Sequence, residues 1–438
     1  MERYSEYKDS GISWIGLIPE HWKTCSVRAY TQEYVEKNKP EKTRELLALS
    51  YALGVTLYRD KQFNMDRVKE NYEDYKIVHE NVLVVSPNDI IKGSAYVSKY
   101  YGCISPMYFT FKSRFEDPTY LLYLSYLLRT KQAGRTFFSL AKGLIGSILD
   151  NGKYVTRRMS VSRYDLLSFK VVMPPLSEQR SIVTYLDKKS SLIESIIADK
   201  EKEIQLLQEL KQKTIAEAVT KGLNPNVKMR DSGISWIGKI PEHWEMKQLR
   251  SFLTLFTEKG HGDAQLLSVT REQGVIIRDK DNKEENHNFV PEDLSGYKYI
   301  EKGDFAINKM KAWQGSYAVS DYCGIVSPAY FTCKLKGVNK DFFSRAIRSK
   351  AYVPFFTQYS KGIRVDQWDL NPNALKSIPF LLPPVDEQQA IVTYIDEKCQ
   401  KIDTLITELQ AEIDYLKEYK QRLIADVVTG QVNVQNLI

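Results

Sequence analysis

The fold is decided by the stretch Trp14–Trp22, which reads Trp-Ile-Gly-Leu-Ile-Pro-Glu-His-Trp, because the chain contains it twice. The second copy, Trp236–Trp244, differs at one position and lies 222 residues further on. At the same spacing, Ser-Pro-Met-Tyr-Phe at 105–109 returns as Ser-Pro-Ala-Tyr-Phe at 327–331. Repetition at a fixed spacing is the signature of a duplicated structural unit, so the sequence predicts two similar globules.

A second repeated block follows each globule. Residues 174–179 read Pro-Pro-Leu-Ser-Glu-Gln, and residues 383–388 read Pro-Pro-Val-Asp-Glu-Gln. The Pro pair ends the preceding strand, the Ser or Asp is suited to cap a helix, and the Glu lies where the helix dipole favours an anion. Gly222 and Gly430 stand just past the last apolar residues, where a left-handed C-terminal cap is expected. Each block therefore predicts a long helix.

Apolar residues recur with heptad spacing along both predicted helices, as in a coiled-coil seam. The second helix is the more regular, since Ser190, Lys200 and Lys211 interrupt the first. The predicted seam consists of Leu186, Ile193, Ile197, Ile204, Leu207, Ile395, Ile402, Ile406, Leu409, Ile413, Leu416 and Leu423. A helix of roughly 43 residues is about 65 Å long, and neither helix can bury its seam alone.

Two kinds of pairing satisfy these seams. The helices can pair with each other inside one chain, antiparallel about a pseudo-two-fold axis, with one globule at each end. Alternatively, each helix can pair with another chain to give a dimer or a filament. Heptad spacing by itself leaves both open.

Inside the globules, short apolar runs such as residues 81–85 and 305–307 alternate with amphipathic helical patches, which indicates the α+β class. The predicted organisation has four parts. They are a first globule at 1–173, a long helix at 174–222, a second globule at 223–382 and a second long helix at 383–438.

The composition is that of a folded chain with no export or membrane signal. Hydrophobic residues make up 43% of the 438 residues and charged residues 27%, close to the averages of globular proteins. Neither a membrane-spanning run nor the apolar core of a signal peptide is found, so a cytoplasmic location is expected. The five cysteines are odd in number and form no Cys-x-x-Cys pair, which argues against disulfides and a zinc ribbon.

The loops of the two globules differ from each other and are rich in basic and aromatic residues. Lys and Arg can bind phosphates, while Arg, Asn and Gln can read base edges, so this mixture favours DNA as the ligand. Each residue taken singly is also what an ordinary solvated surface carries, and the net charge of +7 is only compatible with a polyanion. The candidate contacts are Arg59, Lys61, Lys92, Tyr96, Lys99, Lys142, Lys153, Arg157, Arg158 and Arg163 in the first globule, and Arg271, Gln273, Arg278, Lys309, Lys311, Trp313, Gln314, Lys361, Arg364 and Gln367 in the second.

Signatures of catalysis and metal binding are not found in the sequence. Residues 233–239 have the skeleton of a phosphate-binding loop, but Ile240 replaces the required Ser or Thr. We interpret the Trp residues of the repeated motif as anchors of each globule's first strand against the helices. His21 and His243 have no second ligand at metal-binding spacing, so neither a metal site nor a catalytic residue is predicted.

The order of these motifs resembles the specificity subunits of type I restriction-modification systems. The resemblance rests on the paired Trp-Ile-Gly-x-Ile-Pro-x-x-Trp, Ser-Pro-x-Tyr-Phe and Pro-Pro-x-x-Glu-Gln segments and on the long helices after them. It covers nearly the whole chain, from about residue 8 to residue 430. The copies depart from each other at 87–89, where Pro-Asn-Asp stands against Lys-Met-Lys, and in the longer tail of the first globule.

The resemblance implies a function and a set of partners. Each globule would be a target recognition domain that reads one half of a bipartite double-stranded DNA site, and the helices would fix the gap. The chain itself would be non-catalytic and hold no cofactor. Two modification subunits would bind S-adenosylmethionine and methylate adenine, restriction subunits would use ATP and Mg, and the exposed faces of residues 178–221 and 387–429 would supply subunit contacts.

Two other functions remain open at the level of sequence. An architectural coiled-coil protein could use its globules to hold other proteins without reading DNA, and salt-dependent, sequence-selective DNA binding would separate it from a specificity subunit. A self-sufficient methyltransferase or nuclease is disfavoured because its cofactor and phosphate motifs are missing.

Overall fold

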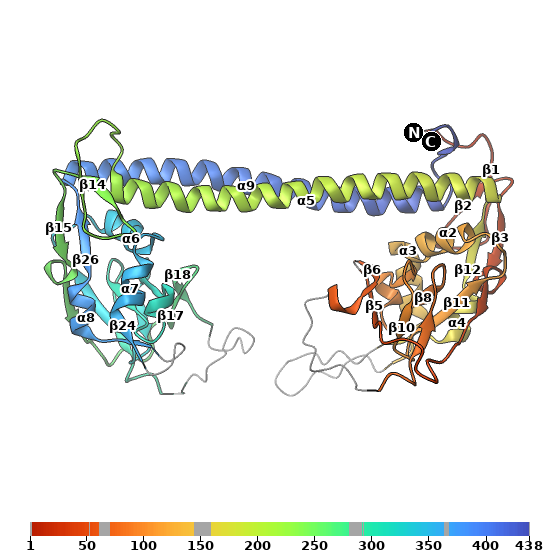
Figure 1. The fold of residues 1–438 in the computed structure, drawn as a ribbon, viewed down its shortest axis with the longest axis horizontal. Coiled ribbons are helices and arrows are strands. Elements are labelled where there is room, and N and C mark those ends of the chain that lie inside the picture. Colours follow the sequence, from red (N-terminus) through yellow and green to blue (C-terminus); the bar gives the residue numbers. More distant parts are fainter. Residues whose placement is uncertain are drawn as a thin grey trace. The chain divides into compact units, whose positions relative to one another are not determined.

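The computed structural model describes residues 2–51, 53–60, 71–143, 159–279, 291, 293–362 and 368–437. The chain divides into two compact units: unit 1 contains Met1–Lys200 and Ala411–Ile438, and unit 2 contains Glu201–Gln410. Each unit therefore combines one globular domain with parts of both long helices, α5 (Leu176–Lys221) and α9 (Val385–Val428) (Figure 1).

In unit 1, the two long helices run antiparallel. Lys200 of α5 pairs with Glu412 of α9, and Glu194, nearer the start of α5, pairs with Lys420, nearer the end of α9. Pairing within one chain, one of the two arrangements that the heptads allowed, is therefore the one observed.

In unit 2, the two long helices also run antiparallel, and hydrogen bonds connect them to each other and to the globular domain. The Lys211 Nζ atom lies 2.6 and 2.7 Å from the two carboxylate oxygens of Asp403. Eleven residues after Lys211, Gly222 follows the end of α5 and lies near Glu387 at the start of α9. Arg345 of α6 (Lys340–Arg348) donates two hydrogen bonds to the Asp396 carboxylate of α9, at 2.6 and 3.0 Å.

The predicted seam residues are all buried or half-buried. Six are buried, namely Leu186, Ile193, Ile395, Ile402, Ile413 and Leu423. Ile197, Ile204, Leu207, Ile406, Leu409 and Leu416 are half-buried. Two helices alone cannot surround a seam completely, so the seam residues are most buried where a globular domain packs against them.

The globular domain of unit 1 is built from small antiparallel sheets and two covering helices. A four-stranded sheet has the order β4 (Thr31–Glu33), β11 (Phe109–Ser113), β8 (Leu83–Val85), β9 (Ala95–Val97). The two-stranded pairs are β1 (Tyr7–Asp9) with β2 (Leu17–Pro19), β3 (Lys23–Ser26) with β12 (Lys170–Met173), β5 (Leu47–Ser50) with β6 (Gly54–Leu57), and β7 (Lys76–Val78) with β10 (Gly102–Ile104). The helical segments are α1 (Val27–Tyr30), η1 (Tyr58–Asp60), η3 (Ile90–Lys92), α2 (Thr119–Leu128), α3 (Lys131–Leu140), α4 (Arg163–Ser168) and η7 (Gln435–Leu437).

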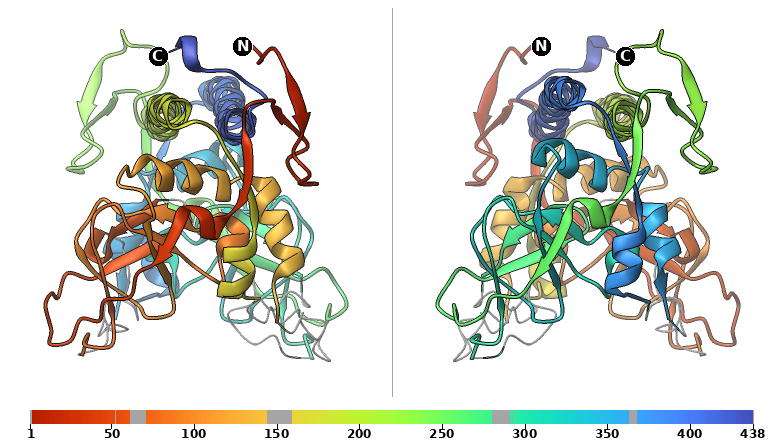
Figure 2. Two further views of the ribbon diagram at one scale, coloured as in Figure 1. Left: turned by 90° about the vertical axis from the view of Figure 1, so that its right-hand side faces the viewer. Right: turned by 90° about the vertical axis from the view of Figure 1, so that its left-hand side faces the viewer.

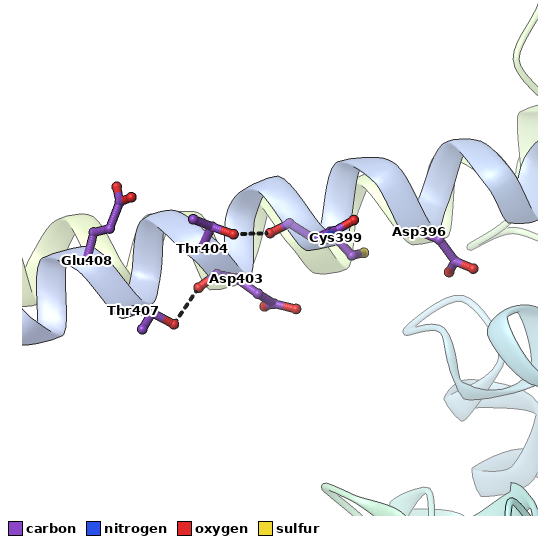
Figure 3. Close-up of a pocket in the computed structure, with 7 residues that line it drawn as sticks. Asp396, Cys399, Asp403, Thr404, Thr407 and Glu408 are labelled. Carbon is purple, nitrogen blue, oxygen red and sulfur yellow. Dashed lines mark hydrogen bonds between the residues drawn. The ribbon is translucent and has the colours of Figure 1, made fainter.

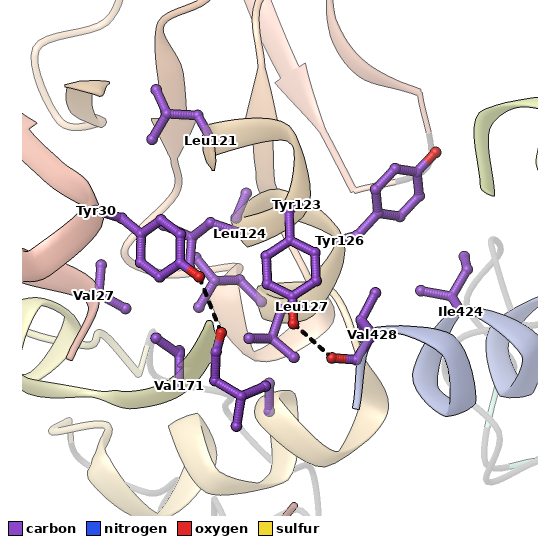
Figure 4. Packing of buried hydrophobic residues seen from close by; sticks show 14 of the residues in the cluster. Val27, Tyr30, Leu121, Tyr123, Leu124, Tyr126, Leu127, Val171, Ile424 and Val428 are labelled. Carbon is purple, nitrogen blue, oxygen red and sulfur yellow. Dashed lines mark hydrogen bonds between the residues drawn. The ribbon is translucent and has the colours of Figure 1, made fainter. Parts of the chain in front are cut away.

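The core of unit 1 includes the end of α9. Figure 4 shows Ile424 and Val428 next to Tyr123 of α2 and the cluster around Tyr30. The buried Tyr123 hydroxyl donates to the Val428 carbonyl at 2.8 Å, and the Tyr30 hydroxyl donates to the Val172 carbonyl at 3.1 Å. Because both hydroxyls have acceptors, these large rings are buried without an unpaired polar atom.

Unit 2 repeats this architecture. Its four-stranded sheet has the order β16 (Leu253–Phe256), β23 (Phe331–Leu335), β20 (Phe305–Ile307), β21 (Tyr317–Val319). The two-stranded pairs are β13 (Met229–Asp231) with β14 (Lys239–Pro241), β15 (Glu245–Gln248) with β26 (Pro379–Leu382), β17 (Leu267–Thr270) with β18 (Gly274–Ile277), β19 (Lys298–Ile300) with β22 (Gly324–Val326), and β24 (Ser360–Lys361) with β25 (Asp369–Leu370). The other helical segments are η4 (Leu249–Ser251), η5 (Ala312–Gln314), α7 (Val353–Tyr359) and α8 (Pro372–Ser377).

Each repeated Trp-Ile-Gly motif forms a hairpin beside a long helix. Hairpin β1–β2 lies beside the end of α9, and hairpin β13–β14 beside the end of α5 (Figure 2). Each unit is thus an α+β domain completed by two antiparallel helix segments. Among the described residues, no helix is both long and apolar enough to span a membrane.

Candidate nucleic-acid interface and the end clamps

In each unit a short antiparallel stem flanks a segment whose length differs between the two copies. In unit 1, Lys142 and Ser160 exchange backbone hydrogen bonds of 2.9 and 3.0 Å. In unit 2, Lys361 pairs with Asp369 in the β24–β25 stem. Of the predicted contacts, Lys61, Lys153, Arg157, Arg158, Arg364 and Gln367 lie outside the described residues.

The stem of unit 2 brings several predicted DNA contacts together. The Lys309 Nζ atom lies 3.0 Å from an Asp369 carboxylate oxygen, and the Leu370 N–H donates to the Lys309 carbonyl at 3.1 Å. The rings of Trp313 and Trp368 lie 5.5 Å apart, centre to centre. Cations beside exposed aromatic edges can contact phosphates and bases.

Two lysines at this stem are free to bind a phosphate. Among the described residues, neither Lys311 nor Lys361 has an ion-pair partner, and both side chains are exposed. A lysine without an intramolecular partner loses little when it binds a phosphate, because no ion pair has to break first. Lys311 and Lys361 are therefore the strongest candidate phosphate contacts of unit 2.

The stem of unit 1 is attached in the same way but is less cationic at its base. The Val161 N–H donates to the Pro87 carbonyl at 2.9 Å, at the position where unit 2 has Lys309. Lys142 and Lys99 are exposed. The other three predicted cations lie near carboxylates: Arg59 with Glu45, Lys92 with Asp89 and Arg163 with Glu33.

Five predicted contacts have other surroundings. The Tyr96 ring packs under the Arg129 guanidinium at 4.0 Å, and its hydroxyl donates to the Tyr51 carbonyl at 2.6 Å. Arg271 and Gln314 line a cavity of about 950 Å³ together with Arg348 and residues of α5. Gln273 is exposed in the turn between β17 and β18, and Arg278 is half-buried just after β18. Tyr96, Arg271 and Gln314 thus face neighbouring side chains or the helix pair rather than a stem.

A constellation that the sequence analysis did not anticipate joins each hairpin to the start of a long helix. In unit 1, the buried Trp22 indole donates to Glu178 Oε2 at 2.9 Å, and His21 Nε2 lies 2.5 Å from Glu178 Oε1. In unit 2, Trp244 and His243 contact Glu387 in the same way, at 2.8 and 2.6 Å. We call each set an end clamp.

The glycine that ends the other long helix completes each end clamp. Gly430, at the end of α9, has φ +76°, and a Cβ atom there would lie 2.4 Å from Pro19 Cδ. Gly222, at the end of α5, has φ +72°, and its Cβ would lie 3.2 Å from the Trp244 ring. Glycine therefore serves both as the helix cap and as the space into which the hairpin packs.

The end clamps correct two sequence-based interpretations. His21 and His243 do contact a carboxylate, but it lies about 150 residues away in the chain, beyond the reach of a spacing argument. Trp22 and Trp244 anchor the hairpins to the helices, whereas Trp14 stacks on Phe169 of its own globule. The signal available in the sequence was that all three residues recur in the second copy, His and Trp after 222 residues and Glu after 209.

A shallow polar groove runs along α9 in unit 2. Figure 3 shows Asp396, Cys399, Asp403, Thr404, Thr407 and Glu408 along a shallow groove. The Thr404 and Thr407 hydroxyls donate to backbone carbonyls one turn earlier, at 3.0 and 2.8 Å. Burial raises the pKa of the Cys399 thiol, which disfavours the reactive thiolate. Within the described ranges, no group of three or more His, Cys, Asp or Glu side chains is placed to hold a metal ion.

Comparison with known proteins explains the duplicated architecture. The chain is 24% identical over 447 residues to the type I restriction enzyme MjaVIII specificity subunit of Methanocaldococcus jannaschii, covering 96% of this chain and 95% of that protein. It is 23% identical over 453 residues to the EcoKI specificity subunit of Escherichia coli K12, covering 96% and 91%. Over nearly its whole length the chain is thus similar to type I restriction enzyme specificity subunits. No protein-family model matches it.

Solved structures share the fold of this chain. A chain from a study of complex assembly and conformational transition in a type I restriction-modification system matches with a TM-score of 0.64 and 13% identity, covering 95% of this chain and 99% of that one. The crystal structure of the HsdS subunit of Thermoanaerobacter tengcongensis matches with a TM-score of 0.51, again at 13% identity, covering 95% and 98%. Both matches extend over nearly the whole chain and show a shared fold.

Proposed function

We propose that the two globular domains each read one half of a bipartite double-stranded DNA site. The observation that carries this proposal is the pair of equivalent stems, which each begin with an exposed lysine, Lys142 or Lys361, and which flank segments of different length. The chain between the paired stem residues runs from 143 to 159 in unit 1 and from 362 to 368 in unit 2. One scaffold with two unlike reading segments suits two unlike half-sites.

The long helices would set the gap between the half-sites. Both helices pass from one unit into the other, so the number of helical turns between the domains fixes how far apart their stems can bind. Half-sites on one face of the duplex must also agree in helical phase, near 34 Å per turn. Helix length thereby becomes part of the DNA specificity.

The partners would supply all of the chemistry. Two modification subunits would dock on the exposed faces of α5 and α9. They would bind S-adenosylmethionine and methylate adenine. Restriction subunits would use ATP and Mg to move along DNA and cut it. DNA modification of this kind places the complex in the cytoplasm.

Exchange of one domain tests the proposal directly. Residues 30–160 are replaced by the corresponding domain of a family member with a known half-site, and methylated adenines are mapped across the host genome. One half-site should change while the other half-site and the gap stay the same. A change in both half-sites, or unchanged methylation in a strain lacking the gene, would contradict reading by two separate domains.

A further inference from the structure

The two end clamps differ in one donor. In unit 1 the Tyr4 hydroxyl donates a third hydrogen bond to Glu178, with 3.1 Å between the oxygens. The Tyr4 ring also lies against His21 and Trp22, with ring centres 5.8 and 5.9 Å away. Burial and the adjacent carboxylate raise the pKa of Tyr4, so this phenol stays a donor at neutral pH.

Unit 2 has no counterpart of this tyrosine. The residue 222 positions after Tyr4 is Asn226, which is exposed on the connection between α5 and β13. Among the described residues, Glu387 accepts hydrogen bonds from Trp244 and His243 only. Its side chain is 40% exposed, against 8% for Glu178.

A cavity occupies the place that Tyr4 fills in unit 1. It measures about 250 Å³ and is lined by Leu223, Val227, Pro241, His243, Glu387 and Ile391, among others. Its walls are mainly apolar, Lys221 and Asn224 also line it, and Glu387 is its one carboxylate. Apolar walls around a single acceptor match a phenol, whose ring is apolar and whose hydroxyl is a donor.

The rim of this cavity also exposes apolar side chains. Leu223, which lines the cavity, is 41% exposed, and Val385, two residues before Glu387 in the first turn of α9, is 73% exposed. The corresponding positions of unit 1 hold Leu176, which is half-buried, and the polar Gln431. Exposed apolar residues next to a cavity are typical of a surface that a partner covers.

We propose that the cavity beside Glu387 receives a tyrosine side chain from a partner protein, in the way that unit 1 receives its own Tyr4. The partner is the modification subunit, and this assignment rests on the proposed function. The ligand class rests only on the cavity and on its filled counterpart. The two ends of the molecule therefore bind their modification subunits differently.

The ligand class can be tested with p-cresol, which is the tyrosine side chain as a free molecule. The full chain is labelled with ¹⁵N at its six Trp residues, and the indole N–H signals are followed during titration. The Trp244 signal should shift and saturate, while the Trp22 signal should not move because Tyr4 already fills its site. Toluene, which lacks the hydroxyl, should bind at least about fivefold more weakly. An unmoved Trp244 signal would overturn the proposal.

Two substitutions provide matched controls for this titration. Asn226→Tyr supplies the missing tyrosine from the chain itself and should abolish the p-cresol shift at Trp244. Tyr4→Asn opens the equivalent site in unit 1 and should make the Trp22 signal respond to p-cresol. If p-cresol still shifts Trp244 in the first variant with wild-type affinity, the cavity is not the binding site.

The partner is tested in the complex. Asn226→Tyr should weaken capture of one of the two modification subunits at least tenfold, while Asn226→Ser, which leaves the cavity open, should bind as the wild type does. Ala390→Trp, on the cavity rim, gives an independent block. If both blocking variants retain full capture, the partner assignment is wrong. The p-cresol result involves no DNA, so failure of the proposed function would be seen separately in the methylation map.

Discussion

Removal of the Glu178 carboxylate should destabilise unit 1 far more than the matching change destabilises unit 2. In Glu178→Ala, the Trp22 indole N–H stays fully buried and loses its acceptor, and the Tyr4 hydroxyl and His21 lose theirs. A buried unsatisfied donor costs about 1–3 kcal/mol, and the lost hydrogen bonds to a charged group add to this. We expect a loss of about 2–4 kcal/mol in the free energy of local unfolding.

The matching change in unit 2 should cost about 1–2 kcal/mol, since one buried donor is affected and water reaches a side chain that is 40% exposed. Hydrogen exchange followed by mass spectrometry measures both losses of stability. Peptides covering residues 14–22 and 176–186 report on unit 1, and peptides covering residues 236–244 and 385–395 report on unit 2. Each 1.4 kcal/mol corresponds to a tenfold change in protection, so unit 1 should exchange roughly 30–700 times faster.

The control is Glu178→Gln, whose amide oxygen can still accept from Trp22 and which should cost at most about 1 kcal/mol. Equal losses in the two units, or a loss below about 0.5 kcal/mol for Glu178→Ala, would refute the reasoning that the buried indole depends on this carboxylate.

Four further predictions follow from the same structure. One extra heptad in both α5 and α9, inserted at the boundary between the units, lengthens each helix by about 10.5 Å and should widen the DNA gap by about three base pairs at 3.4 Å each, read from the methylation map. Gly222→Ala should cost about 1–2 kcal/mol, mainly from the left-handed backbone, and Gly430→Ala about 2–4 kcal/mol because its Cβ would also lie 2.4 Å from a proline ring atom; equal losses in urea unfolding would show that the proline contact is unimportant. Lys311→Ala and Lys361→Ala should each reduce the slope of log affinity against log salt by about one for DNA containing the site, whereas the Lys→Arg changes should leave it unaltered. Glu36, whose pKa is lowered to about 2 by a neighbouring lysine, a tyrosine and a histidine, should stabilise unit 1 above about pH 4.3 and lose that contribution as the pH falls toward 2; Glu36→Gln should flatten this part of the pH–stability curve.

The long helices show how much local sequence can predict. Proline pairs and glycines bound them in the sequence, and the observed helices begin at Leu176 and Val385 and end just before Gly222 and Gly430. These signals act within a few residues, because a missing N–H or a left-handed backbone stops a helix wherever the chain folds. The heptad seam likewise follows from helical periodicity, and it could not decide between pairing within the chain and pairing with another chain.

The candidate interface shows where such prediction ends. Basic and aromatic composition selected residues with several different surroundings: Lys311 and Lys361 are exposed at a stem, Tyr96 packs against Arg129, and Arg271 lines a cavity next to α5. Composition shows which side chains a loop contains, whereas the direction in which each side chain points depends on how the loop packs.

The sequence by itself determined that this protein has two similar α+β domains and two long helices, because a repeat and a helical period are written along the chain. Only the tertiary structure decided that the helices pair antiparallel in one chain and that Glu178 and Glu387 hold the Trp and His of the end clamps. It alone showed that Tyr4 completes one clamp while a cavity remains in the other. The physical reason is that these contacts join residues far apart in sequence, and their partners are chosen by packing and by the need to pair every buried polar group.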